Sequence, residues 1–363
     1  MKNKTIIMHD TFLYKGGGER LILMMAKALN ADLASGFFSA GSFDLRKEGF
    51  KGEMISVSSE IFKKGFRHIK LKWAFLFNTK FLKNYETVIF SGDSISSVRN
   101  CNVTSKKIYY CHTPPRYIYD LHDLYLKKVP FFIKPIFKLF CYVFKKSYES
   151  DVRKMDLVLT NSINTQKRIK KFLGIDSVVL YPPVNLKEFK YISTKDYYLS
   201  FARLSDAKRV DKIVEAFKLM PDKKLLVIYG ENDPQKSKIF SLAKGHSNIE
   251  FKTLPGNVGF TDYVGNCIAT IYIPIDEDFG MSPVESMAAG KPVLGVNDGG
   301  LKETIIDSKT GYLINADLKI EDIVEAVNKL TVEKCLDMKA DCKERANDFS
   351  LSKFEQKLKE IVK

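Results

Sequence analysis

The sequence predicts an α/β protein made of two doubly wound domains, each built on a parallel sheet that helices cover. Its 363 residues are more than one ordinary core needs, and they fit two domains. Short apolar segments alternate with amphipathic helical patterns along the whole chain, which is typical of βαβ units. Apolar residues make up 45% and charged residues 28%, a composition that excludes a disordered chain.

The candidate strands are short segments rich in Val, Ile, Leu and Tyr. In the first half they cover residues 5–8, 87–90, 107–111, 157–160 and 178–181, and in the second half residues 197–201, 225–229, 249–251, 269–273 and 293–296. Helical patterns lie between most of them, for example at 210–220 and 320–330, and one more covers 351–362. Parallel sheets of this kind bind ligands at the carboxyl ends of their strands.

Two adjacent prolines, Pro182 and Pro183, mark the predicted domain boundary, because they end a strand and stiffen the connection. We therefore expect domains at 1–183 and 184–348. Residues 349–363 are expected to form a C-terminal helix that packs back on the first domain.

Excess positive charge lies in the first half of the chain. The net charge is +15, with +16 on residues 1–180 and −1 on residues 181–363, so an anionic partner is expected for the first half. Residues 61–83 and 127–146 combine Lys and Arg with aromatic side chains and contain no acidic residue. This combination predicts contact with an anionic membrane surface. The alternatives are packed helices with a solvated basic face and nucleic-acid binding, for which no motif is present.

The cysteines and the apolar segments indicate the compartment. None of the six cysteines lies in a C-x-x-C pair or has a histidine at zinc-ligand spacing, so we expect neither a disulfide framework nor a zinc site. The apolar run after Lys4 is too short for a signal peptide, and residues 129–144 are too short and too charged to span a bilayer. We therefore expect a cytoplasmic protein that is peripheral at the inner face of the cell membrane.

The strongest chemical signal is the segment 276–293, DEDFGMSPVESMAAGKPV. Glu277 is predicted on a loop after a strand, and Glu285 in the first turns of a helix that begins near Ser282. Both then project near the carboxyl edge of the sheet, where two carboxylates can accept hydrogen bonds from sugar hydroxyls. Open amides at the start of the helix favour an anion. The residues that supply amides there are Phe279, Gly280, Met281 and Ser282.

This segment resembles the E-x7-E signature of retaining glycosyltransferases of family 4, whose GT-B fold has two Rossmann-like domains facing across a cleft. The resemblance extends upstream to residues 201–209 and downstream to 298–303 and 310–313. It implies that Glu285 binds the nucleotide ribose and that Glu277 lies near the donor sugar. It also implies that Arg203 and Lys208 bind the donor pyrophosphate. Two fixed cations would stabilise the departing diphosphate without a metal.

The same segment contains Asp276-x-Asp278, a metal-binding pattern of a different glycosyltransferase fold. A three-letter pattern is weak, so we expect no metal and no cofactor besides the nucleotide-sugar substrate. The resemblance implies a front-face mechanism, in which the acceptor hydroxyl attacks on the side from which the diphosphate leaves.

The first half offers a second group of candidates at strand ends. Gly17 and Gly18 follow the first strand, and in the resembled family such a loop faces the donor phosphates, although a plain tight turn fits them equally. His112 follows another strand and resembles the His of the family's H-x-P segment, which orients the donor sugar or relays a proton. Arg116 is a candidate contact for an acceptor phosphate. Asp93 is a possible acceptor contact, although a helix cap is the favoured interpretation.

Two loops of the second half bear on nucleotide binding. Many family members carry G-x-G where this chain has Gly230-Glu231-Asn232-Asp233, which puts the role of that loop in doubt. Residues 254–258 fall where the family's nucleobase loop would lie.

The resemblance implies a retaining enzyme that moves a hexose from a nucleoside-diphosphate sugar. Mannose from GDP-mannose is favoured by the Cys111-His112-Thr113-Pro114 context, and UDP-sugars stay open. The expected acceptor is a lipid-linked or other glycan of surface polysaccharide or O-antigen synthesis. The alternatives are a non-catalytic membrane or polysaccharide-binding module, and another enzyme of the same fold such as a sugar-nucleotide epimerase or a phosphorylase.

Overall fold

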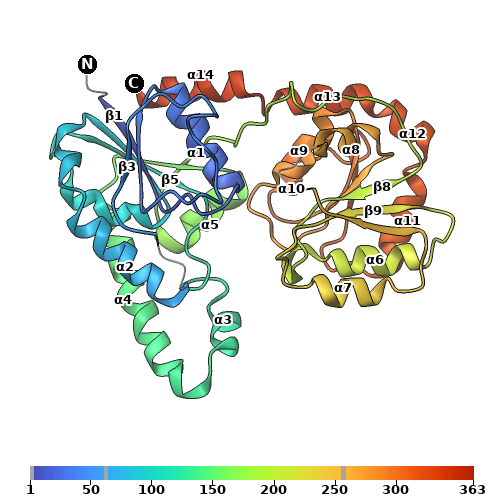
Figure 1. Cartoon of the computed structure of the whole chain (residues 1–363), viewed down its shortest axis with the longest axis horizontal. Coiled ribbons are helices and arrows are strands. Elements are labelled where there is room, and N and C mark those ends of the chain that lie inside the picture. The colour runs from blue at the N-terminus through green and yellow to red at the C-terminus, as the bar shows by residue number, and fades with distance from the viewer. Residues whose placement is uncertain (1–3, 61–63, 255–258) are drawn as a thin grey trace. The chain divides into compact units, whose positions relative to one another are not determined.

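The computed structural model describes residues 4–60, 64–254 and 259–363, and its chain divides into two compact units (Figure 1). Unit 1 consists of Met1–Tyr181 together with Glu355–Lys363, and unit 2 of Pro182–Phe354. Each unit contains one parallel sheet with helices packed around it. The predicted α/β class with two parallel-sheet domains is confirmed.

Unit 1 is built on a seven-stranded sheet in the order β3-β2-β1-β4-β5-β6-β7. All of its pairings are parallel, and the inner strands are buried because helices lie against them. The strand order reverses between β1 and β4, which makes that pair the topological switch point. The strands are β1 (Thr5–His9), β2 (Asp32–Ser35), β3 (Met54–Ser56), β4 (Thr87–Ser91), β5 (Lys106–Cys111), β6 (Leu157–Thr160) and β7 (Val178–Val179).

Local chemistry explains the ends of α5 and the start of α4 in unit 1. In α5 the Ser162 hydroxyl accepts the amide of Thr165 at 3.0 Å, and Gly174 ends the helix at φ 69°. In α4 a proline lies in the first turn, where its missing amide costs nothing. The helices are α1 (Gly17–Ala28), α2 (Lys64–Phe77), α3 (His122–Lys128), α4 (Lys134–Val152) and α5 (Ile163–Leu173), with 3₁₀ turns η1 (Lys80–Asn84), η2 (Gly92–Asn100) and η3 (Phe131–Ile133).

Unit 2 repeats the pattern with a six-stranded parallel sheet in the order β10-β9-β8-β11-β12-β13, whose switch point lies between β8 and β11. Its strands are β8 (Tyr198–Ser200), β9 (Leu225–Ile228), β10 (Ile249–Lys252), β11 (Thr270–Ile271), β12 (Val293–Val296) and β13 (Gly311–Ile314). Its helical elements are η4 (Asp206–Lys208), α6 (Val210–Lys218), α7 (Lys236–Leu242), α8 (Phe260–Asn266), α9 (Met281–Ala288), α10 (Leu301–Thr304), α11 (Ile320–Lys329), α12 (Val332–Asp337) and α13 (Lys339–Asn347).

The last helix, α14 (Leu351–Val362), returns the chain to unit 1. The Leu358 side chain on this helix is fully buried. The ammonium of Lys106, at the start of β5, donates to the carbonyl oxygens of Ile361 and Val362 at 3.1 and 3.0 Å. These contacts hold the end of α14 against the start of β5.

None of the described helices combines the length and the apolar character that crossing a bilayer requires.

Candidate functional site

The predicted residues of unit 2 gather at its switch point. After β8 the chain passes Arg203, forms η4, which ends at Lys208, and then enters α6. After the neighbouring strand β11 it forms the loop of Glu277 and then enters α9. Because both strands are parallel and adjacent, their carboxyl ends open at the same edge of the sheet. The fold therefore brings two cations and two carboxylates of distant sequence to one place.

Lys208 lies in direct contact with Glu277. Its ammonium donates to a Glu277 carboxylate oxygen and, at 2.8 Å, to the hydroxyl of Tyr272. Burial raises the pKa of the Tyr272 phenol well above its usual value, and the hydrogen-bonded Glu277 carboxylate raises it further. Tyr272 therefore stays protonated and fixes both the cation and the carboxylate.

Arg203 is the exposed cation of the site, with 69% of its side chain accessible. Its Nε lies 3.6 Å from a carboxylate oxygen of Asp233. The second Asp233 oxygen accepts the backbone amides of Leu204 and Gly230 at 2.8 and 3.0 Å. The loop at 230–233, which departs from the family's G-x-G, thus ties the chain after β8 to the chain after β9.

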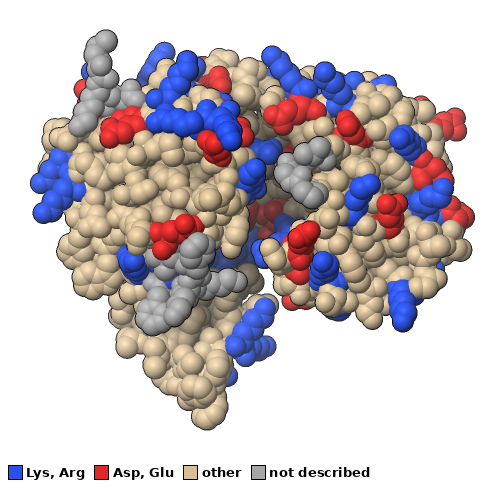
Figure 2. All heavy atoms as spheres, in the orientation of Figure 1, with Lys and Arg blue, Asp and Glu red and all other residues tan. Residues whose placement is uncertain are grey.

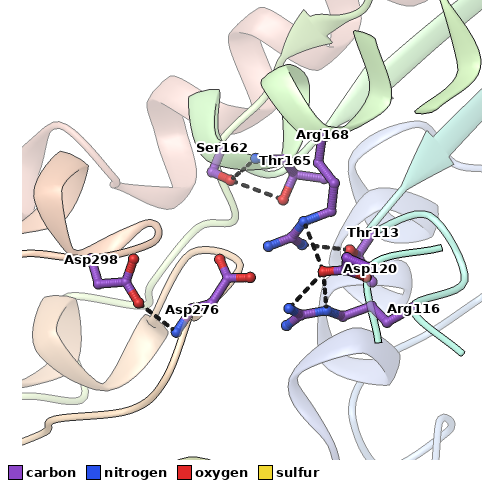
Figure 3. Close-up of polar contacts among 8 residues, drawn as sticks. All are labelled: Thr113, Arg116, Asp120, Ser162, Thr165, Arg168, Asp276 and Asp298. Carbon is purple, nitrogen blue, oxygen red and sulfur yellow. Dashed lines mark hydrogen bonds and ion pairs between the residues drawn. The ribbon is translucent and has the colours of Figure 1, made fainter. Parts of the chain in front are cut away.

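The loop that carries Glu277 is supported from behind by residues 298–300. Asp276 has φ 42°, and its amide donates to the Asp298 carboxylate at 2.8 Å (Figure 3). The amide of Gly300 donates to the Glu277 carbonyl at 2.7 Å. At Gly299 (φ 55°) a Cβ would lie only 2.4 Å from that same carbonyl oxygen. Two glycines are needed here because the two backbone segments touch.

The start of α9 places the remaining predicted residues. Gly280 is the N-cap at φ 86°, and Met281 and Ser282 follow, half-buried, in the first turn. The Phe279 ring is buried against Phe349 with ring centroids 5.4 Å apart, so only its backbone is available to a ligand. Glu285 is half-buried. Its charge also raises the pKa of Tyr272, after the larger effects of burial of the phenol and of the Glu277 charge.

One buried guanidinium, that of Arg209, is a site component that the sequence analysis missed. Its φ of 51° is in the left-handed region, and its side chain is 8% exposed. The guanidinium donates to the carbonyls of Ile273 (2.7 Å), Pro274 (3.0 Å) and Ala316 (2.8 Å). Arg209 thereby fixes Lys208, the preceding residue, to the chain that leads to Glu277.

In unit 1, the predicted His112 belongs to a group of three side chains at the ends of adjacent strands. The Ser91 hydroxyl lies 3.0 Å from His112 Nε2 and 3.0 Å from His9 Nδ1. Burial lowers the pKa of His112 to about 4, and burial together with the His112 charge lowers that of His9 to about 3. Both imidazoles are therefore neutral at pH 7. Gly17 and Gly18 are the first residues of α1, and a Cβ on Gly18 would lie 3.9 Å from His112 Cε1, which places the start of this helix beside the histidine.

A carboxyl group adjoins this histidine group. The Asp10 carboxylate accepts the amide of Ser94 at 3.0 Å, while burial and then the charge of Asp93 raise its pKa well above the usual value. Asp93 itself lies 3.4 Å from His68 Nδ1. The favoured interpretation of Asp93 as a helix cap is wrong, because Ser91 and Ser94 form the capping box of η2.

The predicted acceptor contact Arg116 is part of an arginine pair within unit 1. Its Nε and Nη2 donate to one oxygen of Asp120 at 3.0 and 2.7 Å, and Arg168 Nε lies 3.8 Å from that oxygen (Figure 3). Arg168 also donates to the Thr113 hydroxyl at 2.7 Å. Two guanidinium groups thus share one carboxylate.

Comparison with known proteins decides the family. Residues 185–349 match the family model described as "Glycosyl transferases group 1". An alpha-1,3/1,6-mannosyltransferase ALG2 of Dictyostelium discoideum is 30% identical over 308 residues, which cover 71% of this chain and 70% of that protein. The chain belongs to the group 1 glycosyl transferases. It is therefore a glycosyltransferase enzyme, and the binding-module and epimerase alternatives are not supported.

Two further similarities concern a second relative and the fold. This glycosyltransferase is 25% identical over 263 residues to a "GDP-Man:Man(3)GlcNAc(2)-PP-Dol alpha-1,2-mannosyltransferase" of Dictyostelium discoideum, covering 63% of this chain and about half (52%) of that protein. Anabaena Alr3699/HepE, solved in complex with UDP and glucose, superposes with a TM-score of 0.75 at 14% identity and covers 98% of each chain. The GT-B fold expected from the sequence is confirmed.

Each unit of this glycosyltransferase brings its own predicted residues together. Unit 2 gathers Arg203, Lys208, Glu277, Glu285 and the 279–282 turn, and unit 1 gathers Gly17, Gly18 and His112. The sequence analysis missed Arg209, Tyr272, His9, Ser91 and Asp10, although each lies at or next to a predicted strand end or a quoted motif. Residues 255–258 of the expected nucleobase loop lie outside the described residues. In the described part of the chain, no three His, Cys, Asp or Glu side chains form a group that could hold a metal ion.

Proposed function

We propose that this glycosyltransferase transfers mannose from GDP-mannose to a lipid-linked glycan with retention of the anomeric configuration, as an enzyme of family 4. The observation that carries the proposal is the contact of Lys208 with Glu277 and Tyr272 at the β8–β11 switch point, with the exposed Arg203 just after β8. A relative of this chain is named for GDP-Man as donor and a PP-Dol glycan as acceptor, which supports both substrate classes.

The roles follow from the chemistry of each group. Lys208 and Arg203 stabilise the negative charge on the departing diphosphate, which is greatest in the transition state. Glu277 accepts a hydrogen bond from the donor sugar while it holds Lys208, and Glu285 accepts hydrogen bonds from the ribose. His112 is neutral at pH 7 because of its lowered pKa, so it orients the sugar as a hydrogen-bonding group and not as a cation.

The proposed chemical step needs no protein nucleophile. The acceptor hydroxyl forms a bond to the anomeric carbon on the face from which the diphosphate leaves. The bond from that carbon to the phosphate oxygen breaks, and the hydroxyl proton passes to the departing phosphate. Catalysis without a metal ion stays a prediction.

Two finer parts of the proposal concern the pathway and a second class of donor. Surface polysaccharide or O-antigen synthesis is the pathway expected from the sequence, and it stays a prediction. UDP-sugars are the second candidate donors, because a solved protein of the same fold binds UDP and glucose.

Nucleotide titration tests the donor site. We expect GDP to bind purified protein without added metal more tightly than UDP does. Lys208→Ala removes charge-assisted hydrogen bonds and should weaken GDP binding by about 10- to 100-fold, and Glu285→Ala by about tenfold. Lys329→Ala, which breaks an exposed ion pair with Glu325 on α11, is the matched control and should bind GDP normally.

A transfer assay then tests the reaction. GDP-mannose and lipid extract should yield a mannosylated lipid whose new linkage is α by NMR, and Lys208→Ala should abolish most of it. Equal GDP affinity in Lys208→Ala and in Lys329→Ala would overturn the donor-site assignment. Tight binding of UDP alone would move the donor to a UDP-sugar.

A further inference from the structure

One face of unit 1 exposes an apolar surface that its own fold does not cover. Helices α2 and α4 lie side by side on this face (Figure 1), and several of their large apolar side chains are more than half exposed. Those are Trp73, Phe77, Ile136, Leu139, Tyr142 and Val143. Soluble proteins rarely expose contiguous apolar patches of this kind unless the patch binds something.

The same two helices enclose a groove with a volume of 420 Å³. Ile69, Trp73 and Leu76 line it from α2, and Leu139 and Val143 are among the residues that line it from α4. Lys72 is the one polar residue among the described residues that line the groove. Its ammonium lies 3.9 Å from the centre of the Phe144 ring, and burial lowers its pKa. With so few hydrogen-bonding partners, the groove fits a hydrocarbon chain and not a sugar or a peptide.

The charges around this face identify what covers it. Residues 127–146 contain six lysines and no acidic residue, and Lys138, Lys145 and Lys146 on α4 are exposed. Figure 2 shows blue side chains and no red ones on the visible surface of the tip that α3, η3 and α4 form. This combination is complementary to anionic lipid headgroups above an apolar layer. A second copy of the chain is disfavoured, because a symmetric pair of these faces would bring the same lysines together.

We propose that the α2–α4 face docks on an anionic bilayer and that the groove takes one acyl chain of a bilayer phospholipid beside Trp73. The inference rests on the lipid-linked acceptor of the proposed function, since docking would place the enzyme at the surface where such an acceptor resides. It concerns unit 1 alone and needs no donor.

Trp73 makes the test specific, because it is the single tryptophan of the chain. The full-length protein is mixed with vesicles of equal parts phosphatidylglycerol and phosphatidylcholine, with the acyl chains of the phosphatidylcholine brominated in one arm. We expect a blue shift of Trp73 emission in both arms and strong quenching in the brominated arm. Vesicles of phosphatidylcholine alone should bind at least tenfold more weakly, as measured by sedimentation.

Two variants of equal charge separate the groove from general electrostatics. Leu139→Asp places a carboxylate in the groove and should weaken vesicle binding at least tenfold. Val103→Asp adds the same charge at a 91% exposed position outside the α2–α4 face and should bind vesicles like the parent protein. Circular dichroism and thermal unfolding of both variants show that unit 1 is folded, and GDP binding shows that the donor site of unit 2 is intact. A failure of docking is thereby distinguished from a failure of the donor site.

Three results would overturn the proposal. The first is sedimentation with vesicles without quenching by brominated chains, since the protein would then bind through another surface. The second is equal vesicle binding by the two aspartate variants. The third is a blue shift of Trp73 that grows with protein concentration in the absence of vesicles, which would identify a second copy as the occupant.

Discussion

At the scale of single residues, the Ser91 hydroxyl joins two histidines that cannot carry a charge at neutral pH. His9 and His112 lie on either side of it at 3.0 Å, at the ends of adjacent strands. The structure holds both imidazoles in their neutral form because burial penalises the charged one. His9 therefore acts on the site by holding Ser91, which in turn holds His112.

This arrangement predicts a loss of stability in acid. Both folded-state pKa values, about 3 and about 4, lie below the ordinary value of 6.5, so the stability contributed is complete above about pH 6.5 and is lost as pH falls toward them. Each histidine adds up to about 1.4 kcal/mol per pH unit to the slope of the unfolding free energy. We expect the unfolding free energy, measured by urea denaturation between pH 7 and pH 4.5, to depend less steeply on pH in His9→Asn than in the parent protein. The difference in this pH slope should be up to that amount.

The neighbouring carboxyl groups of Asp10 and Glu19 have raised pKa values, so their contribution to the pH slope of stability has the opposite sign to that of the histidines. They titrate in both the parent protein and the variant. The difference between variant and parent at each pH therefore isolates His9. An unchanged slope in His9→Asn would show that the histidine is not the group that takes up the proton.

At the scale of elements, the loop of Glu277 depends on the tight turn at 298–300. Gly299→Ala adds a Cβ 2.4 Å from the Glu277 carbonyl oxygen at a φ of 55°. We expect the loop to move and GDP affinity to fall at least tenfold, as measured by calorimetric titration. Gly245→Ala is the control in the same unit, because its φ is also positive (86°) while its Cβ would meet nothing within 4 Å. The control should lose only about 1 kcal/mol of stability and should bind GDP normally.

The strands also show where sequence patterns were sufficient to predict an element and where they were not. Strands β6 (Leu-Val-Leu-Thr) and β12 (Val-Leu-Gly-Val) were predicted to the residue because Leu and Val supply most of their residues and are buried almost throughout, as central parallel strands require. Strands β2, β3 and β13 were missed. β2 reads Asp-Leu-Ala-Ser with a buried aspartate at its start, and β3 has only three residues, so neither has a long apolar run. β13 does contain the apolar run Tyr-Leu-Ile after Gly311, but its first residues were identified only as part of a motif.

The residues of the candidate site likewise divide into those that a local sequence pattern predicts and those that it does not. Lys208 and Glu277 lie in segments with a distinctive local pattern, and the structure joins them. Arg209 ends the quoted segment 201–209 and Tyr272 lies in the predicted strand 269–273, but no local pattern assigns either to the site. Their roles depend on which carbonyls and charges meet them across the sheet edge. Contacts of that kind depend on the topology of the whole sheet and are not visible in a local sequence.

At the scale of the whole molecule, the end of the chain belongs to the unit where the chain began. Leu358→Ala leaves a cavity under α14 and should cost unit 1 about 2–5 kcal/mol. Hydrogen exchange should rise in β5, whose Lys106 holds the end of α14, and stay unchanged in β8–β13. Lys357→Ala, a substitution at the exposed neighbouring position, should change neither the stability of unit 1 nor hydrogen exchange in β5. Equal acceleration in both units would contradict the assignment of α14 to unit 1.

The return of the chain to unit 1 also sets an order for biosynthesis. All of Pro182–Phe354 is synthesised before the nine residues Glu355–Lys363. Unit 2 is thus complete while unit 1 still lacks the segment that carries Leu358. We expect unit 1 to reach its final stability only after Glu355–Lys363 has been synthesised, with the apolar surface that Leu358 covers open to chaperones until then.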